Sequence, residues 1–260
     1  MIDKLFDLSG RVALITGGNG GIGLGMAEGL ASQGCEVSIW GTNGDKNAKA
    51  LETLQRYGPK VSALKCDVAD QQAVETCFKQ TLDTHGRVDG CFANAGIGGR
   101  PTQFDQMEKE EWTRIMQVNL DGVFHTFRCA AEHMRLRSEA GDPFGRLIST
   151  ASLAAISGQA RGEHYAATKG GLISMNKALA VEYARHHVTA HTILPGWIET
   201  EMTQQTFSSE KFVGNVMPRV PMRRWGQPED FAGIAVYIMS GASSYHTSET
   251  FLIDGGYANF

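Results

Sequence analysis

Several features that assign a protein to a class are missing from this sequence of 260 residues. Positive charge is not in excess, because 24 lysines and arginines stand against 28 aspartates and glutamates, and this balance argues against electrostatic binding of nucleic acid. No apolar run reaches the length that a membrane-spanning helix needs. The five cysteines include no Cys-x-x-Cys pair and the eight histidines no His-Glu-x-x-His motif, so we expect neither a disulfide framework nor a metal site.

The remaining composition is that of a globular protein with a buried core. Hydrophobic residues make up 42% of the chain and charged residues 20%. Most cysteines fall in apolar segments, which predicts buried thiols in a reducing compartment. We therefore expect a soluble protein of the cytoplasm that binds neither membranes nor nucleic acid.

Short apolar segments that favour strands alternate with helical segments along the chain. The predicted strands cover residues 11–16, 36–40, 61–66, 90–93, 145–150, 189–194 and 250–253. The predicted helices cover about residues 21–33, 45–57, 67–85, 109–137, a stretch ending near 186, and 228–240. This alternation predicts a parallel sheet with helices on both faces, that is, a single doubly wound α/β domain over residues 1–260.

One segment, residues 196–227, lacks a clean helical or strand period. It contains Pro218 and Pro221 and mixes polar, aromatic and methionine residues. A long irregular segment within a compact domain is often a binding loop, so we predict that it covers the substrate. The alternative is a surface insertion without fixed structure.

A tyrosine and a lysine, Tyr165 and Lys169, stand four residues apart in a helix-forming segment. This spacing places both side chains on one face of the helix. The pKa of a free phenol is about 10, and a nearby ammonium lowers it, so the pair can exchange a proton near neutral pH. The same spacing also arises by chance, with a half-buried tyrosine and a solvated lysine, so the assignment depends on what accompanies the pair.

A glycine-rich turn from Thr16 to Gly23 follows the first predicted strand and opens a helix. In this context Gly17 permits the tight turn, Gly21 lets the backbone approach a pyrophosphate, and Gly23 allows close packing of helix against strand. The helix N-terminus supplies free N–H groups and the positive end of the helix dipole. The turn therefore predicts dinucleotide binding, whereas glycines without this context would indicate only a flexible turn.

Together these segments resemble the short-chain dehydrogenase/reductase family, from about Leu8 to the C-terminus. The matching motifs are Thr16-Gly17-x-x-x-Gly21-x-Gly23, Asn94-Ala95-Gly96, Asn119, Ser152, Tyr165-x-x-x-Lys169, Pro195-Gly196 with Thr200, and Asp254-Gly255-Gly256. The resemblance implies a Rossmann-type domain of about seven parallel strands, assembled as a homotetramer or a homodimer. It also implies an NAD(P)-dependent oxidoreductase that interconverts a secondary alcohol and a ketone by hydride transfer.

The resemblance assigns four catalytic roles. Tyr165 would be the general acid/base, and Ser152 would hydrogen-bond the same oxygen as charge develops on it. Lys169 would lower the pKa of Tyr165 and bind the nicotinamide ribose, and Asn119 would hold a water that links Lys169 to solvent. The alternatives without catalysis are that Ser152 caps the end of a strand and that Asn119 satisfies backbone groups at a helix bend.

The resemblance also implies which residues contact the cofactor. They are Gly17, Asn19, Gly20, Gly21, Ile22, Gly23, Thr42, Asn43, Asp67, Val68, Asn94, Ala95, Gly96, Tyr165, Lys169, Pro195, Gly196, Ile198 and Thr200. Many NAD-binding proteins carry an acidic residue at the position that Gly41 occupies here. Neither Thr42 nor Gly20 supplies a basic side chain for the 2′-phosphate of NADP. Lacking an evident cation, we favour NAD(H) over NADP(H), with use of both as the alternative. Asp67 could instead cap the next helix, or do both.

The predicted substrate is a small alcohol or ketone. Candidate contacts are Ser152, Ala154, Gln159, Arg161, His164, Trp197 and Met202. Arg161 and His164 could recognise a carboxylate or a polyol, or could instead lie at the rim or at a subunit contact. Residues 21–29 and 223–226 are similar to those of sugar-acid and 3-oxoacyl reductases, so both substrate classes stay open.

Two other functions remain as alternatives. An NAD-dependent sugar epimerase or dehydratase shares the tyrosine–lysine motif but usually carries a larger C-terminal substrate domain. A non-enzymatic protein that senses dinucleotides usually loses the catalytic tyrosine or lysine, and this sequence retains Tyr165 and Lys169.

Overall fold

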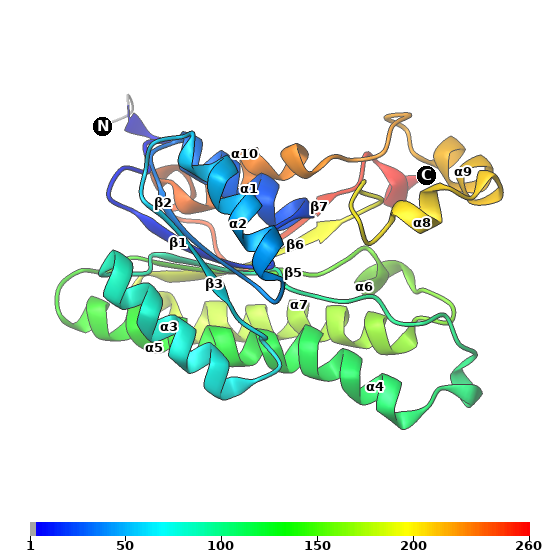
Figure 1. Ribbon diagram of the computed structural model, residues 1–260, viewed down its shortest axis with the longest axis horizontal. Helices are drawn as coiled ribbons and strands as arrows, with labels where there is room; N and C mark the ends of the chain where they lie inside the picture. The colour runs from blue at the N-terminus through cyan, green and yellow to red at the C-terminus, as the bar shows by residue number, and fades with distance from the viewer. Residues whose placement is uncertain (1–3) are drawn as a thin grey trace.

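The computed structural model describes residues 4–260, which form one seven-stranded sheet with the order β3-β2-β1-β4-β5-β6-β7 (Figure 1). All six pairs of neighbouring strands are parallel. The strands are β1 (Val12–Thr16), β2 (Glu36–Gly41), β3 (Val61–Lys65), β4 (Gly90–Ala93), β5 (Gly145–Thr150), β6 (Val188–Pro195) and β7 (Thr250–Ile253). The predicted doubly wound α/β domain is confirmed, as are all seven predicted strands to within two residues.

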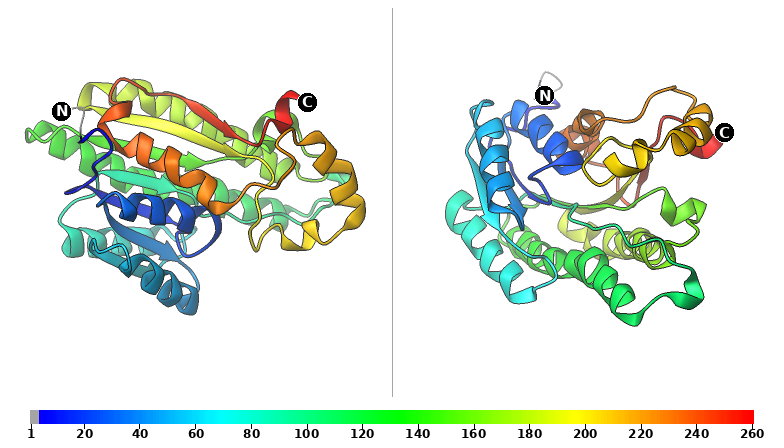
Figure 2. Two further views of the ribbon diagram at one scale, coloured as in Figure 1. Left: turned by 90° about the horizontal axis from the view of Figure 1, so that it is seen from above. Right: turned by 45° about the vertical axis from the view of Figure 1, so that its right-hand side comes forward.

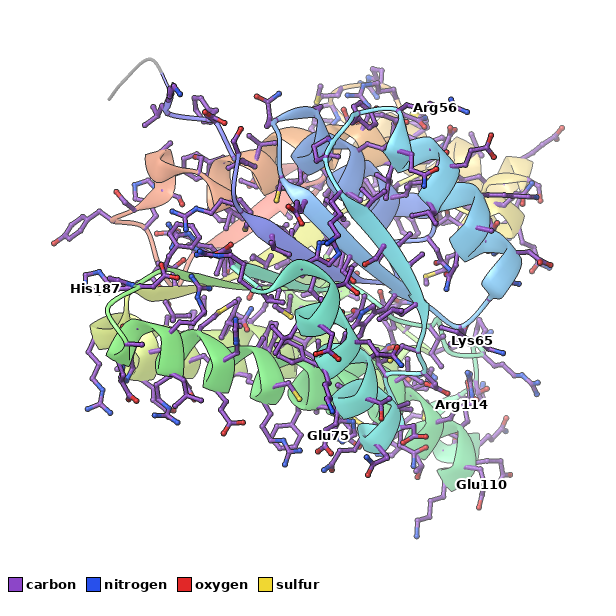
Figure 3. The ribbon with its side chains drawn as sticks, turned by 60° about the vertical axis from the view of Figure 1, so that its left-hand side comes forward. Arg56, Lys65, Glu75, Glu110, Arg114 and His187 are labelled. Atoms are coloured by element: carbon purple, nitrogen blue, oxygen red, sulfur yellow. The ribbon has the colours of Figure 1, made fainter. Side chains whose placement is uncertain are left out.

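Helices cover both faces of the sheet. They are α1 (Gly21–Ser32), α2 (Gly44–Gln55), α3 (Gln71–His85), α4 (Lys109–Met116), α5 (Gly122–Glu139), α6 (Ala154–Ser157), α7 (Glu163–Tyr183), α8 (Gln204–Phe207), α9 (Glu210–Val216) and α10 (Ala232–Met239). In Figure 1, α1, α2 and α10 lie above the sheet and α3, α4, α5 and α7 below it. Charged side chains such as Glu75 and Glu110 cover the outer surface of α3 and α4 (Figure 3).

Two apolar cores separate the sheet from its helices. The core beneath α1 and α10 includes Met26, Leu30 and Phe231, and the core on the other face includes Phe127 and Leu172. Burial on both faces explains why the strands read as continuous apolar runs rather than as alternating polar and apolar residues. Four of the five cysteines are buried and all five are unpaired, which confirms the expectation of free thiols.

The chain reverses its direction of travel across the sheet between β1 and β4. Parallel strands direct their carboxyl ends to one edge, and ligands bind outside that edge at the reversal point. The segments that begin at Gly17, Asn94, Ala151 and Gly196 follow β1, β4, β5 and β6 directly. The fold therefore gathers the predicted motifs at one edge.

The helix predicted over residues 109–137 is not continuous. It consists of α4, a π-helical segment over Gln117–Asp121, and α5. A π-helical turn holds one more residue than an α-helical turn, which periodicity in the sequence does not reveal. Asn119 lies in this segment.

The helix predicted to open at Asp67 begins instead at Gln71. Asp70 caps it by accepting hydrogen bonds from the backbone N–H groups of Gln72 and Ala73, at 2.9 and 3.2 Å. Asp67 accepts from the N–H of Ala69 in the preceding turn, so it is not the helix cap.

Residues 196–227, which we call the substrate loop after their predicted role, are folded and project beyond the carboxyl edge of the sheet (Figure 2). They contain α8 and α9, which an aromatic cluster holds together. The ring of Phe207 stacks on Trp225 with 4.4 Å between centroids, and Phe212 meets Trp197 edge to face at 4.9 Å. These contacts contradict an insertion without fixed structure.

Candidate active site

The glycine turn leaves the N-terminus of α1 open to a ligand. No side chain caps α1 at Gly20, whereas Asn43 and Asp70 cap α2 and α3. A Cβ atom on Gly23 would lie 2.3 Å from the carbonyl oxygen of Gly17, so the turn must fold back tightly on the helix. Free N–H groups and close backbone approach are what the pyrophosphate of a dinucleotide requires, so the turn fits that group.

Asn94 connects this turn to the neighbouring strand. Its side-chain amide donates to the carbonyl oxygens of Thr16 and Gly17 at 3.2 and 3.3 Å. In return, the hydroxyl of Thr16 accepts from the N–H groups of Asn94 and Ala95, both at 3.0 Å. The Asn-Ala-Gly motif thus holds the glycine turn in shape, and direct contact of these residues with the cofactor stays a prediction.

The structure gives a reason for the missing acid at Gly41. A Cβ atom there would lie 2.1 Å from the side-chain nitrogen of Asn19, which donates to Asn47 at 2.7 Å. A carboxylate at this position would displace Asn19. Beyond it, Thr42 and Asn43 are exposed at the predicted adenosine end of the site, with Asn43 accepting from the N–H of Lys46.

The four predicted catalytic residues come together next to this edge. Ser152 hydrogen-bonds the Tyr165 hydroxyl, and the ammonium of Lys169 lies 5.5 Å from the centroid of the Tyr165 ring. A Cβ atom on Gly96 would lie 3.3 Å from Oδ1 of Asn119 and 3.4 Å from Nζ of Lys169, so these two side chains meet at one point. Residues from the segments after β4 and β5, from α7 and from the π-helical segment thus converge.

Asn119 is fully buried and bound to backbone. Its Oδ1 accepts from the N–H of Ile97 at 2.8 Å, and its Nδ2 donates to the carbonyl of Ile97 at 3.0 Å. The side chain therefore satisfies backbone groups of the segment after β4. This resembles the alternative role without catalysis, in which Asn119 satisfies backbone groups at a helix bend. Its role in holding a water stays a prediction.

Burial raises the pKa of Tyr165, and the hydrogen bond with Ser152 opposes this shift. This differs from the expectation that Lys169 lowers the tyrosine pKa. The Lys169 ammonium donates to the carbonyl of Thr150 at 2.7 Å, and burial lowers its own pKa to about 8. In the absence of cofactor, the Tyr165 hydroxyl is therefore protonated at neutral pH and can serve as a proton donor.

The shifted Lys169 predicts a measurable pH effect on stability. Because its pKa is about 8 in the folded protein and about 10.4 unfolded, the unfolded chain binds more protons between these values. The cost of burying the ammonium is thus complete below pH 8 and declines as pH rises. In urea unfolding without cofactor, we expect the stability advantage of Lys169→Met over wild type to shrink by about 2 kcal/mol between pH 7 and 9.5. A constant difference would contradict the lowered pKa.

The predicted substrate residues differ in position. Gln159, Arg161 and Met202 are exposed, whereas Ala154 and Trp197 are half-buried. Trp197 packs within the aromatic cluster of the substrate loop. His164 is fully buried, so both the rim position and the surface contact between subunits considered for it are wrong. His164 precedes Tyr165 in the sequence, but in the first turn of α7 its side chain points into the protein.

Two contacts at the site could not be found from sequence motifs. One is the Thr150 carbonyl that accepts from Lys169. The other is an ion pair between Lys46 of α2 and Glu201 of the substrate loop. Both join segments far apart in the chain through ordinary residues or backbone, so no local pattern marks them.

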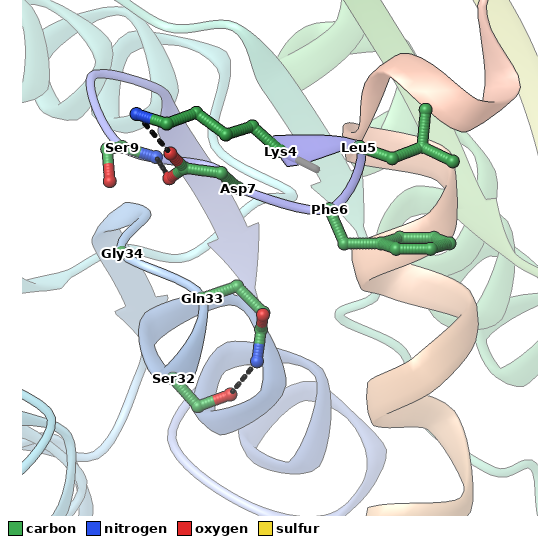
Figure 4. A pocket seen from close by; sticks show the side chains of 8 residues that line it. All are labelled: Lys4, Leu5, Phe6, Asp7, Ser9, Ser32, Gln33 and Gly34. Carbon is green, nitrogen blue, oxygen red and sulfur yellow. Dashed lines mark hydrogen bonds and ion pairs between the residues drawn. The ribbon is translucent and has the colours of Figure 1, made fainter. Parts of the chain in front are cut away.

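A hollow of about 600 Å³ lies at the N-terminal side, lined by residues 4–7, Ser9 and residues 32–34 (Figure 4). It contains none of the predicted site residues. Within residues 4–260 there is no group of three or more histidine, cysteine, aspartate or glutamate side chains that could hold a metal ion, and no helix is long and apolar enough to span a membrane.

Comparison with known proteins agrees with this geometry. A family model described as enoyl-(acyl carrier protein) reductase matches residues 17–258. The chain is 34% identical to a 3-oxoacyl-[acyl-carrier-protein] reductase of Chlamydia pneumoniae, over 96% of this chain and 97% of that protein. It is 33% identical to gluconate 5-dehydrogenase of Gluconobacter oxydans, over 97% and 96% of the two chains.

Solved structures extend the likeness to the whole fold. A short-chain type dehydrogenase/reductase from Mycobacterium marinum matches with a TM-score of 0.90 and 33% identity, over 99% of both chains. A putative 2-deoxy-D-gluconate 3-dehydrogenase from Agrobacterium tumefaciens with bound NADP has a TM-score of 0.89 and 32% identity, over 98% and 99%. A 3-ketoacyl-(acyl-carrier-protein) reductase from Brucella melitensis complexed with NADH has a TM-score of 0.88 and 30% identity, over 96% and 99%. The chain therefore belongs to the short-chain dehydrogenase/reductase family of NAD(P)-dependent oxidoreductases.

Proposed function

We propose that this protein interconverts a secondary alcohol and a ketone with Tyr165 as the general acid/base. The observation that carries the proposal is the convergence of Tyr165, Ser152 and Lys169 beside the open N-terminus of α1. A nicotinamide bound there supplies the hydride in reduction and takes it up in oxidation. All other steps fall to side chains of this chain.

In reduction, Tyr165 donates its proton to the substrate oxygen as hydride reaches the carbonyl carbon. Its raised pKa keeps that proton in place at neutral pH. The hydroxyl of Ser152 stabilises the negative charge that develops on the same oxygen. Lys169 has three donors and uses one on Thr150, which leaves others for the ribose hydroxyls of the cofactor. In oxidation the proton returns to Tyr165.

We propose that the cofactor is NAD or NADP without strong preference. The expectation of NAD rested only on the absence of a basic residue that could bind the 2′-phosphate of NADP. The relatives include structures with NADP and with NADH. Gly41 lacks a carboxylate that would repel a 2′-phosphate, whereas the nearby Lys46 is paired with Glu201. We expect kcat/KM values for NADH and NADPH within about tenfold of each other.

The substrate is a small carbonyl compound that enters beneath the substrate loop. The relatives act on 3-oxoacyl groups and on sugar acids, as their names state. The exposed or half-buried candidates Gln159, Trp197 and Met202 lie on segments that follow β5 and β6, where such a compound would reach Tyr165. His164 takes no direct part in this contact because it is buried.

A panel of ketones and alcohols, followed at the absorbance of reduced nicotinamide, tests the proposal. We expect net oxidation of NADH or NADPH with at least one ketone of the 3-oxoacyl or keto-sugar classes. Cofactor that stays bound through purification without net turnover would favour the epimerase or dehydratase alternative. Binding without any reaction would favour a dinucleotide sensor.

Assembly and location remain predictions. Exposed apolar residues on neighbouring helices, Phe124 and Leu136 of α5 and Val181 of α7, support a homotetramer or homodimer. Light scattering that gives the mass of a single chain would contradict it. The unpaired thiols support a reducing compartment such as the cytoplasm.

A further inference from the structure

We propose that Arg100 and Arg161 form an anion-binding site at the mouth of the active site, so that the preferred substrate carries a carboxylate. This inference rests on the proposed function and names the substrate class of the same site. The two arginines lie on different loops, and no motif or spacing in the sequence predicts that they are close together.

One hydrogen bond joins the two loops, and a second lies within the loop of Arg100. The N–H of Thr102 donates to the carbonyl of Arg161 at 3.4 Å, and the Thr102 hydroxyl donates to the carbonyl of Arg100 at 3.2 Å. One loop leads from β4 to α4, and the other leads from α6 into α7, which carries Tyr165 (Figure 1). The backbone of Arg100 and that of Arg161 therefore lie close together, next to the first turn of α7.

Both guanidinium groups are exposed and free. Within residues 4–260 neither takes part in an ion pair, and only their backbone groups form hydrogen bonds, Arg100 N–H with Glu111 and Arg161 N–H with Glu163. Arg114 binds Glu111 through two hydrogen bonds and neutralises it. Glu111 is thus paired with Arg114, and the guanidinium groups of Arg100 and Arg161 are left without an ion-pair partner in the described part of the chain.

The backbone of Arg161 is also unusual. Its φ of 63° lies in the left-handed region, which costs a residue with a side chain about 1 kcal/mol relative to glycine. Such conformations gather at binding sites because the surrounding structure must maintain them. Here the loop retains an arginine where glycine would be less strained, consistent with a role for its side chain.

A buried imidazole lies directly beneath the first loop. Both ring nitrogens of His164 are buried without a hydrogen-bond partner. A Cβ atom on Gly99 would lie only 1.9 Å from Nε2, so the ring supports the backbone beside Arg100. Nε2 is also 3.7 Å from Oε1 of Glu111, too far for a hydrogen bond. The ring therefore bears on the anion site only by supporting the loop that carries Arg100.

The distance along the chain limits the shape of the substrate. Arg161 lies two residues before α7 begins at Glu163, and Tyr165 lies in the first turn of that helix. A carboxylate held by the arginines would thus lie several bonds from a carbonyl at Tyr165. A keto acid with its ketone far from its carboxylate meets this condition.

One matched pair of ketones tests the charge directly. 5-Dehydro-D-gluconate and L-sorbose carry the same ketone and hydroxyl groups and differ in having a carboxylate or a CH2OH group at the far carbon. We expect wild type to reduce the acid with the higher kcat/KM. In Arg100→Gln and in Arg161→Gln, the ratio of kcat/KM for the acid to that for L-sorbose should fall about tenfold, mainly through KM, because each change removes a charge-assisted hydrogen bond. Arg56→Gln, which also removes an exposed arginine without a side-chain partner, should leave the ratio unchanged.

A second pair of variants tests the support under the loop. Gly99→Ala places a methyl group against the imidazole of His164 and should lower the same ratio, whereas nothing lies within 4 Å of a Cβ atom on Gly98. Gly98→Ala is the matched control and should retain the wild-type ratio. Circular dichroism checks that both variants fold.

The outcomes separate this inference from the proposed function. A preference for L-sorbose, or a preference for the acid that the arginine variants leave intact, would overturn the anion site while the oxidoreductase stands. Reduction of other ketones but of neither member of the pair would overturn it as well. If no ketone at all oxidises the reduced cofactor, both proposals fail.

Discussion

Replacing Tyr165 with phenylalanine is expected to lower kcat for ketone reduction by about 10²- to 10⁴-fold, because the change removes the proton donor. The ring remains, and with it the packing against Lys169, whose ammonium lies 5.5 Å from the ring centroid. The affinity for the reduced cofactor, measured by the fluorescence of its nicotinamide, should stay near the wild-type value. Loss of turnover without loss of binding identifies a role in the chemical step.

Tyr183→Phe provides the matched control. Tyr183 is the last residue of the same helix, α7, and lies five turns away from Tyr165. The variant removes the same kind of hydroxyl group. This variant should keep both turnover and cofactor binding. If Tyr165→Phe also retained near-normal turnover, another residue would have to be the general acid and the proposed mechanism would be wrong.

The second large effect is expected at the glycine turn. A methyl group added by Gly23→Ala would lie 2.3 Å from the carbonyl oxygen of Gly17 and 2.6 Å from the side-chain nitrogen of Asn94. A backbone carbonyl cannot move away as a flexible side chain can, so the turn must open and its N–H groups lose their alignment. We expect cofactor affinity to fall by about 100-fold, the equivalent of about 3 kcal/mol of strain and lost contacts. Titration of the protein with NADH and with NADPH measures the loss.

Gly233→Ala is the control for this change. Gly233 also lies in a helix, α10, but a Cβ atom there meets nothing within 4 Å. Alanine is the better helix former, so this variant should fold with unchanged cofactor affinity. Normal affinity in folded Gly23→Ala would show that the turn does not hold the phosphates.

The fold was predictable from local chemistry. Strands buried on both faces read as apolar runs, and the glycine, proline and polar residues between them mark where they end. Errors occurred where geometry departs from regular periods. The π-helical turn around Asn119 and the capping of α3 by Asp70 instead of Asp67 shift boundaries by a few residues that no hydrophobic pattern records.

The chemistry of individual groups was less predictable. From its spacing alone, Lys169 should lower the pKa of Tyr165, yet burial raises that pKa and the Thr150 carbonyl engages the ammonium. His164 looked like a surface candidate and is buried. Electrostatic shifts depend on desolvation, and desolvation depends on which segments cover a residue.

By itself, the sequence determined that this chain forms a parallel α/β sheet and that it carries a phosphate turn and a tyrosine–lysine pair in family order, because strand burial, turn geometry and helical spacing are local properties. Only the tertiary structure decided that Gly96, Asn119 and Lys169 meet at one point, and that the loops of Arg100 and Arg161 are joined. These contacts connect residues that are distant in the chain, and their existence depends on how the sheet brings the ends of its strands together.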